Sequence, residues 1–306
     1  MGQDLTLTTS SMNITKYKKI FLSISVVLVL ASLIVIAVKG LDYSIEFNGG
    51  SVLEMSYEQR PSIDELKQVV TELGIDAQIQ PLGEQGVVVR TDTLSEENRK
   101  LLTSTLSLVG ESEGTVERFN SIGPSVGKEL RTKSLYALIF VSLGIVFFVA
   151  YAFRKVSQPV SSWKYGVVAV IALLHDIIIP IGILTLLGTE IDTLYVVGLL
   201  SILGLSVNDT IVVFDRIREQ LELNEEKNIR EDFDTTVSHS VSQTIVRSIF
   251  TSLTLVVVLL ALYLVGPVAT QTLALVLLLG TLVGTYSSIF LASPLLTVLV
   301  NKKKSE

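Results

Sequence analysis

Long apolar segments without charged residues alternate with polar stretches along this chain of 306 residues. Ile20–Val38 and Leu135–Phe153 each hold 19 residues without a charge, and residues 248–301 hold no charge at all. About 20 apolar residues, at 1.5 Å per residue, cross the ~30 Å hydrocarbon core of a bilayer. The last run is too long for one crossing, and it breaks at Gly266-Pro267, where turn residues separate two apolar blocks.

Two further apolar segments carry isolated charges in their interiors, so the pattern predicts six transmembrane helices. The predicted spans cover residues 20–39, 134–153, 164–188, 192–215, 238–265 and 268–300. The predicted organisation is therefore an N-terminal segment, 1–19, a first span, a polar domain, 40–133, and a five-helix transmembrane domain, 134–306.

Basic residues in short flanks predict the orientation of these spans. They lie before span one, between spans two and three, after span four and after span six: Lys16, Lys18, Lys19, Arg154, Lys155, Lys164, Arg216, Arg218, Lys227, Arg230 and Lys302–Lys304. The connections 189–192 and 265–270 carry no basic residue. Both termini are therefore expected in the cytoplasm, and the polar domain 40–133 on the external side.

The polar domain alternates strand-like and helix-like patterns. Tyr43–Phe47 and Ser51–Tyr57 flank Asn48-Gly49-Gly50, which predicts a hairpin. Ser62, followed by Glu65 three residues later, predicts a capped helix start. The other expected elements are strands at 77–81, 87–91 and 115–122 and a helix at 95–108. Two β–α–β units in about 90 residues predict a ferredoxin-like α+β sandwich.

Composition supports this partition and excludes several functions. Charged residues make up only 18% of the chain and the mean hydropathy is +0.57, yet residues 40–133 hold 16 acidic and 9 basic residues. The absence of cysteine excludes a disulfide framework, and the net charge of −6 argues against nucleic acid as a partner. The scattered acids indicate a solvated surface, and no cofactor or metal site is predicted.

Charged residues inside the predicted spans are costly and are therefore the candidate functional groups. Asp209 lies 17 residues, or ~25 Å of helix, beyond Asp192 and only six residues before Asp215. If span five begins near Val237, Arg247 lies ~15 Å along it, at a comparable depth. A direct contact would offset the burial cost of both charges. Position alone leaves two interpretations equal: a proton-coupled pair and a static salt bridge.

A second polar pair interrupts span three. Asp176 lies 12 residues, or ~18 Å, beyond Lys164, near the expected midplane. Its neighbour His175 is rotated by about 100° on a helix, so the two side chains are expected to face different neighbours. The favoured interpretation is that both join helices by hydrogen bonds. Small residues that favour close packing lie on spans four and six: Gly198, Ser201, Gly204, Gly280 and Gly284.

Enzymatic functions have little support. The chain lacks the Gly-x-Gly-Asp segment of intramembrane aspartyl proteases, because Asp209 follows Ser206-Val207-Asn208. It also lacks a P-loop, so it is not expected to hydrolyse ATP. The sequence therefore predicts a protein that is not an enzyme, and an ion gradient is the expected source of any work.

Several segments resemble the SecF branch of the SecD/SecF family of protein-export membrane proteins. They include Leu174-His175-Asp176, the continuous run Gly204–Glu219, Ser240–Ser248, Thr251–Thr254, Gly284–Phe290, Ala292-Ser293-Pro294 and, upstream, Ile122–Leu130. The resemblance covers roughly residues 18–300 and is most specific around Asp209. One departure concerns the family's usual Gly-Ile-Asp-Phe-x-Gly-Gly, which is Ser44-Ile45-Glu46-Phe47-Asn48-Gly49-Gly50 here.

The resemblance implies one half of a resistance–nodulation–division-type bundle in the bacterial cytoplasmic membrane, with SecD as the other half. It implies that the complex assists the SecY translocon by pulling exported, unfolded polypeptides outward with the energy of the proton gradient. By the same resemblance, Asp209 matches the proton-relay aspartate and Arg247 the arginine that faces it. Supporting positions in the family motifs are Asn208, Thr210, His175 and Asp176.

Two alternative functions remain open at this point. One is half of a small-molecule exporter of the resistance–nodulation–division type, although the chain holds a single half and no internal repeat. The other is a scaffold that organises translocon subunits without transporting anything. Co-purifying partners would separate the first alternative from protein export, and substitution of Asp209 and Arg247 would separate the second.

Overall fold

The computed structural model describes residues 14–110, 113–153 and 160–301, and the chain forms two compact units. The helical unit consists of residues up to Leu41, Ala137–Thr189 and residues from Leu194 onward. The α+β unit consists of Asp42–Tyr136 together with Glu190–Thr193. Five basic residues used above for orientation, Arg154, Lys155 and Lys302–Lys304, lie outside the described residues.

The described residues contain six helical segments that are long and apolar enough to cross a membrane, as the sequence predicted. Five of them are single helices: α1 (Lys18–Lys39), which follows a short turn η1 (Ile14–Tyr17), α5 (Pro124–Ala152), α6 (Ser162–Leu187), α7 (Thr193–Glu226) and α8 (Phe233–Val265). The sixth is interrupted, since α9 (Val268–Tyr286) passes through a π-helical turn, η2 (Ser287–Ala292), into α10 (Ser293–Asn301).

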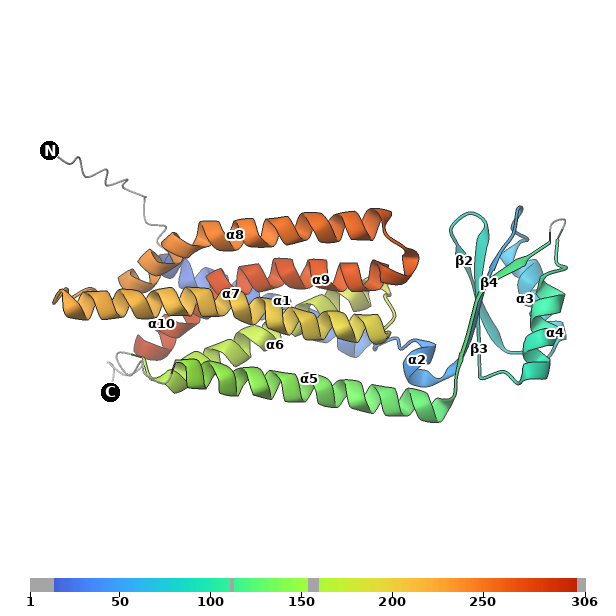
Figure 1. Ribbon diagram of the computed structural model, residues 1–306, viewed down its shortest axis with the longest axis horizontal. Helices are drawn as coiled ribbons and strands as arrows, with labels where there is room; N and C mark the ends of the chain where they lie inside the picture. The colour runs from blue at the N-terminus through green and yellow to red at the C-terminus, as the bar shows by residue number, and fades with distance from the viewer. Residues whose placement is uncertain (1–13, 111–112, 154–159, 302–306) are drawn as a thin grey trace. The chain divides into compact units, whose positions relative to one another are not determined.

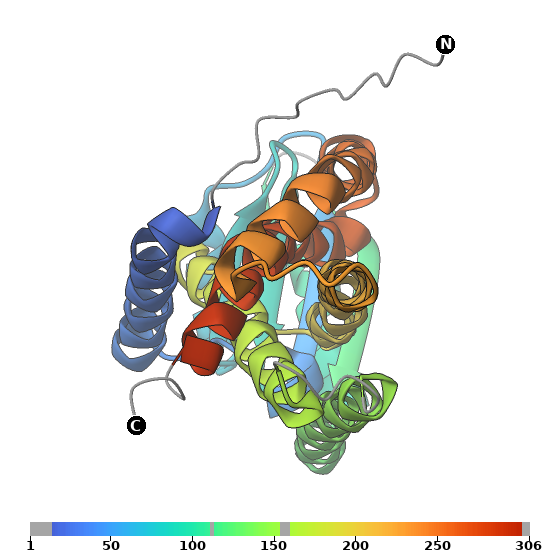
Figure 2. The ribbon, with the colours of Figure 1, turned by 90° about the vertical axis from the view of Figure 1, so that its left-hand side faces the viewer.

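The helices of this unit differ in how much of their surface the chain itself covers. About half of α6 and α7 and 44% of the α9–α10 segment are buried, whereas α1, α5 and α8 are buried by 11% or less. Seen end-on in Figure 2, α1 and α5 lie on the outer sides of the bundle. Apolar side chains on these outer helices, such as Val27, Phe147 and Val258, are exposed. Such surfaces are suited to lipid or to a second membrane protein.

Within the described residues, the α+β unit contains one four-stranded antiparallel sheet, covered on one face by two helices (Figure 1). Its elements are β1 (Gly50–Ser56), α3 (Ile63–Glu72), β2 (Ala77–Leu82), β3 (Gly86–Thr91), α4 (Glu96–Leu106) and β4 (Thr115–Ile122). The strand order β2-β3-β1-β4, with helices after β1 and β3, is the split β–α–β arrangement. The predicted ferredoxin-like α+β domain is therefore confirmed.

Alternation along the central strands forms the core of this domain. Leu53 of β1 and Val89 of β3 are inward-facing and buried against Leu66 of α3 and Leu106 of α4. Tyr57 follows β1, and its hydroxyl donates to the Leu106 carbonyl at 3.0 Å. Burial raises the pKa of Tyr57 to about 12, so this donor stays protonated.

The capping box predicted at Ser62 is present. The Glu65 backbone N–H donates to Ser62 Oγ at 3.2 Å, and the Ser62 N–H donates to Glu65 Oε2 at 3.0 Å. Both orphan donors at the start of α3 are satisfied, because the two side chains reach toward each other across the first turn.

The hairpin predicted around Asn48-Gly49-Gly50 is wrong. Residues Ile45–Asn48 form a one-turn helix, α2, and β1 pairs with β3 on one side and with β4 on the other. Both edges of β1 are therefore occupied, so a strand at 43–47 has no edge to join. The glycines serve close packing instead: at Gly49, with φ +81°, an added Cβ would lie 2.7 Å from Pro124 Cα.

Candidate functional site

Asp209 lies in the interior of α7 on a face that is only partly covered by the chain. It is half-buried, its neighbour Asn208 is exposed, and Thr210 is buried, where its hydroxyl donates to Ser288 Oγ at 3.5 Å. Apolar residues on the rest of this turn, such as Val207 and Val213, pack in the core. The helix therefore turns Asp209 toward the boundary between α7 and its neighbours α8 and α9.

A cavity of about 70 Å³ opens beside Asp209 in this boundary. Its walls come from α7, α8 and α9, and many of its lining residues carry a hydroxyl, a carboxyl or an amide: Leu205, Ser206, Asn208, Asp209, Thr251, Ser252, Leu255, Gly280, Thr281, Gly284 and Thr285. Thr285 Oγ1 donates to Ser252 Oγ at 2.6 Å, whereas Thr281 Oγ1 is buried without a hydrogen-bond partner among the described residues. A space of this size with several hydroxyl groups in its walls can hold ordered water.

Two glycines of α9 make room for this cavity to form at a close helix contact. An added Cβ at Gly280 would overlap the side chain of Ile202 on α7, and one at Gly284 would lie 3.2 Å from Ser206 Cβ. The small face that the sequence predicted on span six therefore packs against α7. The hydroxyls of α9 are held close to the Asp209 face of α7 as a consequence.

Arg247 lies on α8, and its side chain is exposed. The direct contact that the sequence suggested is absent, because Asp209 and Arg247 form no ion pair in the described part of the chain. The guanidinium is still near enough for its charge to act on the Asp209 carboxylate. Ser248, next to Arg247, turns inward toward Asp209, and its hydroxyl makes no hydrogen bond of standard geometry among the residues described.

Asp176 of α6 forms a second and more enclosed polar cluster. It is fully buried, and Ser206 Oγ of α7 and Ser287 Oγ of η2 both donate to its Oδ2, the latter at 2.7 Å. Its other oxygen, Oδ1, lies 2.9 Å from His175 Nδ1. His175 and Asp176 do meet different neighbours on the other helices, as expected, since His175 stacks on Tyr286 and Asp176 binds the two serines. The hydrogen bond between the two side chains themselves was not expected.

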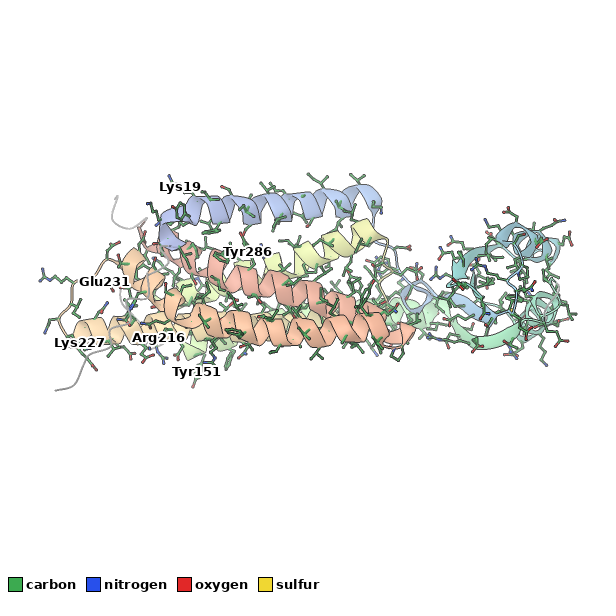
Figure 3. All side chains as sticks on the ribbon, turned by 90° about the horizontal axis from the view of Figure 1, so that it is seen from above. Lys19, Tyr151, Arg216, Lys227, Glu231 and Tyr286 are labelled. Atoms are coloured by element: carbon green, nitrogen blue, oxygen red, sulfur yellow. The ribbon has the colours of Figure 1, made fainter. Side chains whose placement is uncertain are left out.

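The helices around this cluster depart from regular α-helix. Pro180 lies inside the continuous helix α6, and because proline has no N–H, the carbonyl of Asp176 four residues earlier loses its usual donor. Across the contact, η2 is π-helical and presents Ser287 and Ser288. Tyr286, labelled in Figure 3, stacks on His175 at 6.1 Å between ring centroids and donates to the Phe21 carbonyl of α1 at 3.1 Å. The cluster thus joins α1, α6, α7 and the α9–α10 segment.

The sequence pointed to the charged residues of this site but not to the hydroxyls that connect them. Ser206 is the main omission: it donates to Asp176 and also lines the Asp209 cavity. A signal was available, since Ser206 precedes Asp209 by three residues and so shares its helix face. No comparable signal marks Ser287 or Thr281, because their roles depend on which helices pack together.

A hydrolase reading of the chain has one superficial match. Gly123-Pro124-Ser125-Val126-Gly127 has the Gly-x-Ser-x-Gly spacing, but Ser125 lies in the first turn of α5 rather than between a strand and a helix. The described histidines, His175 and His239, hydrogen-bond to Asp176 and Gln243. No serine–histidine pair is formed in the part of the chain that the structure describes.

Comparison with known families decides which proteins these features belong to. The model for the C-terminal region of the protein-export membrane proteins SecD and SecF matches residues 103–302, about two thirds of the chain. The model for the SecD/SecF GG motif matches residues 34–59. The chain belongs to the SecD/SecF family. The resemblance noted from the sequence is therefore confirmed, and the family consists of membrane transport proteins rather than enzymes.

Relatives within the SecD/SecF family agree in length and in fold. The protein translocase subunit SecF of Thermobaculum terrenum is 38% identical over 95% of this chain and 94% of its own, and that of Anaerolinea thermophila is 36% identical over 94% of both. The crystal structure of SecDF, a translocon-associated membrane protein from Thermus thermophilus, matches with a TM-score of 0.83 at 32% identity over 95% of this chain.

The solved SecDF structures are longer than this chain. SecDF in its super-membrane-facing form matches with a TM-score of 0.69 at 30% identity over 96% of this chain. This chain covers 39% of each solved SecDF chain. It is therefore a SecF-type subunit with the six-helix and α+β architecture of its family, and it corresponds to part of a larger SecDF assembly.

Proposed function

We propose that this SecF-type chain pairs with a SecD-type half and uses the proton gradient to assist export. In this proposal the termini are cytoplasmic and the α+β unit is external. The complex draws unfolded polypeptide outward from the SecY translocon, and Asp209 is the group that takes up and releases protons. Arg247 responds to the charge on Asp209, and the resulting helix movement is the working stroke.

This proposal rests mainly on the surroundings of Asp209. A carboxyl group in the middle of an apolar span is costly, and such groups are kept where they face protein or water. Asp209 has a hydroxyl-lined cavity of about 70 Å³ at its side, so it can exchange a proton through ordered water. One charge crossing the membrane supplies ~2.3 kcal/mol per 100 mV, which is enough to shift a two-state helix arrangement.

The separation of Asp209 and Arg247 suits a responsive pair better than a fixed salt bridge. Their attraction exists only while the carboxylate is charged, so each protonation removes it and each release restores it. Without a direct hydrogen bond, no contact has to be broken before the helices move. Asn208 lines the same cavity and Thr210 anchors the turn to Ser288, so both are proposed to support this segment.

Exposure of polar groups on α7 and α8 supports a membrane partner. Asn208 and Arg247 are exposed in this chain although both lie within spanning segments. Lipid cannot solvate such groups, so they are expected to face protein or a water-filled path. A SecD-type half that covers this face would enclose Asp209, Arg247 and the cavity between two bundles.

The experiment uses inverted membrane vesicles that contain the translocon and the assembled complex. With wild type, an imposed proton gradient should raise the yield of exported polypeptide, and Asp209→Asn should abolish that increase while assembly stays normal. Full stimulation in Asp209→Asn would favour a scaffold and overturn the proton relay. Purification with a SecD-like protein and translocon subunits is expected, and their absence would favour a small-molecule exporter.

A further inference from the structure

The connection between α6 and α7 is bound into the α+β unit. Glu190–Thr193 belongs to that unit although both flanking helices cross the membrane. The Ser44 N–H donates to the Ile191 carbonyl at 3.0 Å, and the Ile191 N–H donates to the Asp42 carbonyl at 2.8 Å. These two bonds form a parallel bridge between the segment after α1 and this loop. A loop that only connects two helices over the surface does not need backbone hydrogen bonds to another segment.

Glu46 binds the first residue of α7. Its Oε2 accepts the backbone N–H of Thr193 at 2.6 Å, and a carboxylate there also meets the positive end of the helix dipole. Glu46 is itself held in α2, whose first turn is closed by Ser44 Oγ and whose end runs directly through Gly49 into β1. The residue that departs from the family's usual aspartate therefore links the start of α7 to the sheet.

A third contact, the Arg90–Glu190 ion pair, joins the loop to strand β3. Arg90 Nη1 of β3 lies 2.6 Å from Glu190 Oε1, and both side chains are about three-quarters buried. The same guanidinium group donates to Gln80 of β2 at 3.1 Å, so it is braced by the neighbouring strand. Burial raises the pKa of Glu190, as do the nearby Asp42 and Asp192 carboxylates, whereas Arg90 counteracts this rise. Arg90 is thus the cation that faces the Glu190 carboxyl group.

From these contacts, which all lie within the α+β unit, we propose that Glu46 and the Arg90–Glu190 pair form a coupling junction that ties Thr193, the first residue of α7, and the loop before it to the sheet. Asp209 lies 16 residues, or ~24 Å, along the same uninterrupted helix from Thr193. A shift or rotation of α7 on protonation of Asp209 therefore pulls directly on the bound loop, and the three contacts pass that motion to β1 and β3. This inference rests on the proposed proton relay at Asp209, and it assigns the residues that deliver its stroke.

The first test removes each contact in the assembled complex and measures gradient-driven export in vesicles. Coupling free energies of 1–3 kcal/mol correspond to about 5- to 150-fold effects, so Arg90→Ala and Glu46→Ala should each lower the gradient-dependent yield at least about fivefold. Glu46→Gln keeps an acceptor for the Thr193 N–H and should lose about twofold or less. The matched control is Arg118→Ala, which removes the Arg118–Glu54 pair at 3.6 Å in the same sheet and should leave the yield unchanged.

Rescue distinguishes coupling from a loss of folding. The exchange Arg90→Glu with Glu190→Arg restores the pair in reverse and should recover most of the yield. The chain has no cysteine, so Tyr43→Cys and Ile191→Cys can add a single disulfide across the bridge. Bridged neighbours are ~4.8 Å apart, within the range that a disulfide spans. In an Arg90→Ala background, oxidation should restore the yield and a reductant should abolish that gain.

The outcomes separate this inference from the proposed function. If Arg90→Ala and Glu46→Ala keep full gradient-driven export while Asp209→Asn loses it, the junction is overturned and the proton relay stands. A disulfide that blocks export instead of restoring it would also overturn the junction, because it would show a contact that must open. If Asp209→Asn keeps full gradient-driven export, the proton relay is overturned, and the junction that rests on it is overturned with it.

Discussion

Asp176 and Asp209 both lie in the apolar interiors of membrane-spanning helices, α6 and α7, and their surroundings are opposite. Asp176 is fully buried, and His175, Ser206 and Ser287 satisfy both of its oxygens. Asp209 is half-buried beside a polar cavity, with Arg247 near it but not bonded to it. The proposed roles follow this difference: Asp176 as a fixed joint between helices, and Asp209 as the group that changes its charge. The comparison therefore bases the proposed function of Asp209 on its open surroundings and not on its position in the membrane alone.

The largest expected difference between the two carboxyls is in activity. Asp209→Asn and Arg247→Gln should each remove gradient-dependent export by at least about tenfold, and the double variant should be no worse than either single one. The reason is that each residue acts only through the charge of the other. Vesicle export with and without a proton gradient measures this, and additive losses would show that the two act separately.

The loss of stability on substitution should be larger for Asp176 than for Asp209, the reverse of the order for activity. Asp176→Ala leaves three buried polar groups without their partner and should lower the free energy of unfolding by about 3 kcal/mol or more. Asp209→Asn breaks no direct hydrogen bond and should change it by less than about 1 kcal/mol. Thermal unfolding of the purified complex in detergent measures both, and equal losses would remove the distinction between joint and relay.

Disturbed packing at the cavity should lower the free energy of unfolding by less than the loss of the Asp176 side chain does. Gly280→Ala places a methyl group into Ile202 and should cost about 2 kcal/mol, as overpacking of a tight contact does. Gly144→Ala is the matched control, because an added Cβ at Gly144 of α5 meets no atom of another element within 4 Å among the described residues. A loss at Gly144 as large as at Gly280 would contradict the close contact of α7 and α9.

The smallest effect concerns Ser206, the residue that touches both regions. Ser206→Ala removes one hydrogen bond to Asp176 and should lower the free energy of unfolding by about 1 kcal/mol. Because its hydroxyl also lines the Asp209 cavity, gradient-driven export should fall as well, though less than in Asp209→Asn. Ser287→Ala removes the other donor to Asp176 without touching the cavity, so its stability loss should come without a matching loss of export.

The sequence predicts those features of the fold that depend on local patterns along the chain. Hydropathy runs decide spans from the chain alone, so the six apolar helices were predictable, as was the capping box of Ser62 and Glu65. The order of strands and helices along the chain was predictable because strand alternation and helix periodicity are also local patterns. Tyr43–Phe47 was mistaken for a strand because the pairing of β1 with both β3 and β4 is a tertiary fact.

The candidate site shows the same division. Asp209 and Arg247 stand out because charges are rare in apolar runs, and their helices do pack together with α9 around one cavity. The direct contact that the sequence suggested is absent among the described residues, because the Arg247 side chain is exposed and which face of α8 meets α7 depends on helix packing. The register also differs from the one expected, since α8 begins at Phe233 and not near Val237. The fold of His175 onto Asp176 and the π-helical turn at Ser287–Ala292 depend on side-chain rotamers and on helix contacts, which no local pattern records.

The central claim is that Asp209 exchanges protons and that Asp176 does not. Infrared difference spectroscopy of the assembled complex across a pH titration measures it directly, through the carbonyl band of a protonated carboxyl group. A titrating band is expected in wild type, and it should persist in Asp176→Asn and disappear in Asp209→Asn. A band that survives in Asp209→Asn and is lost in Asp176→Asn would contradict it.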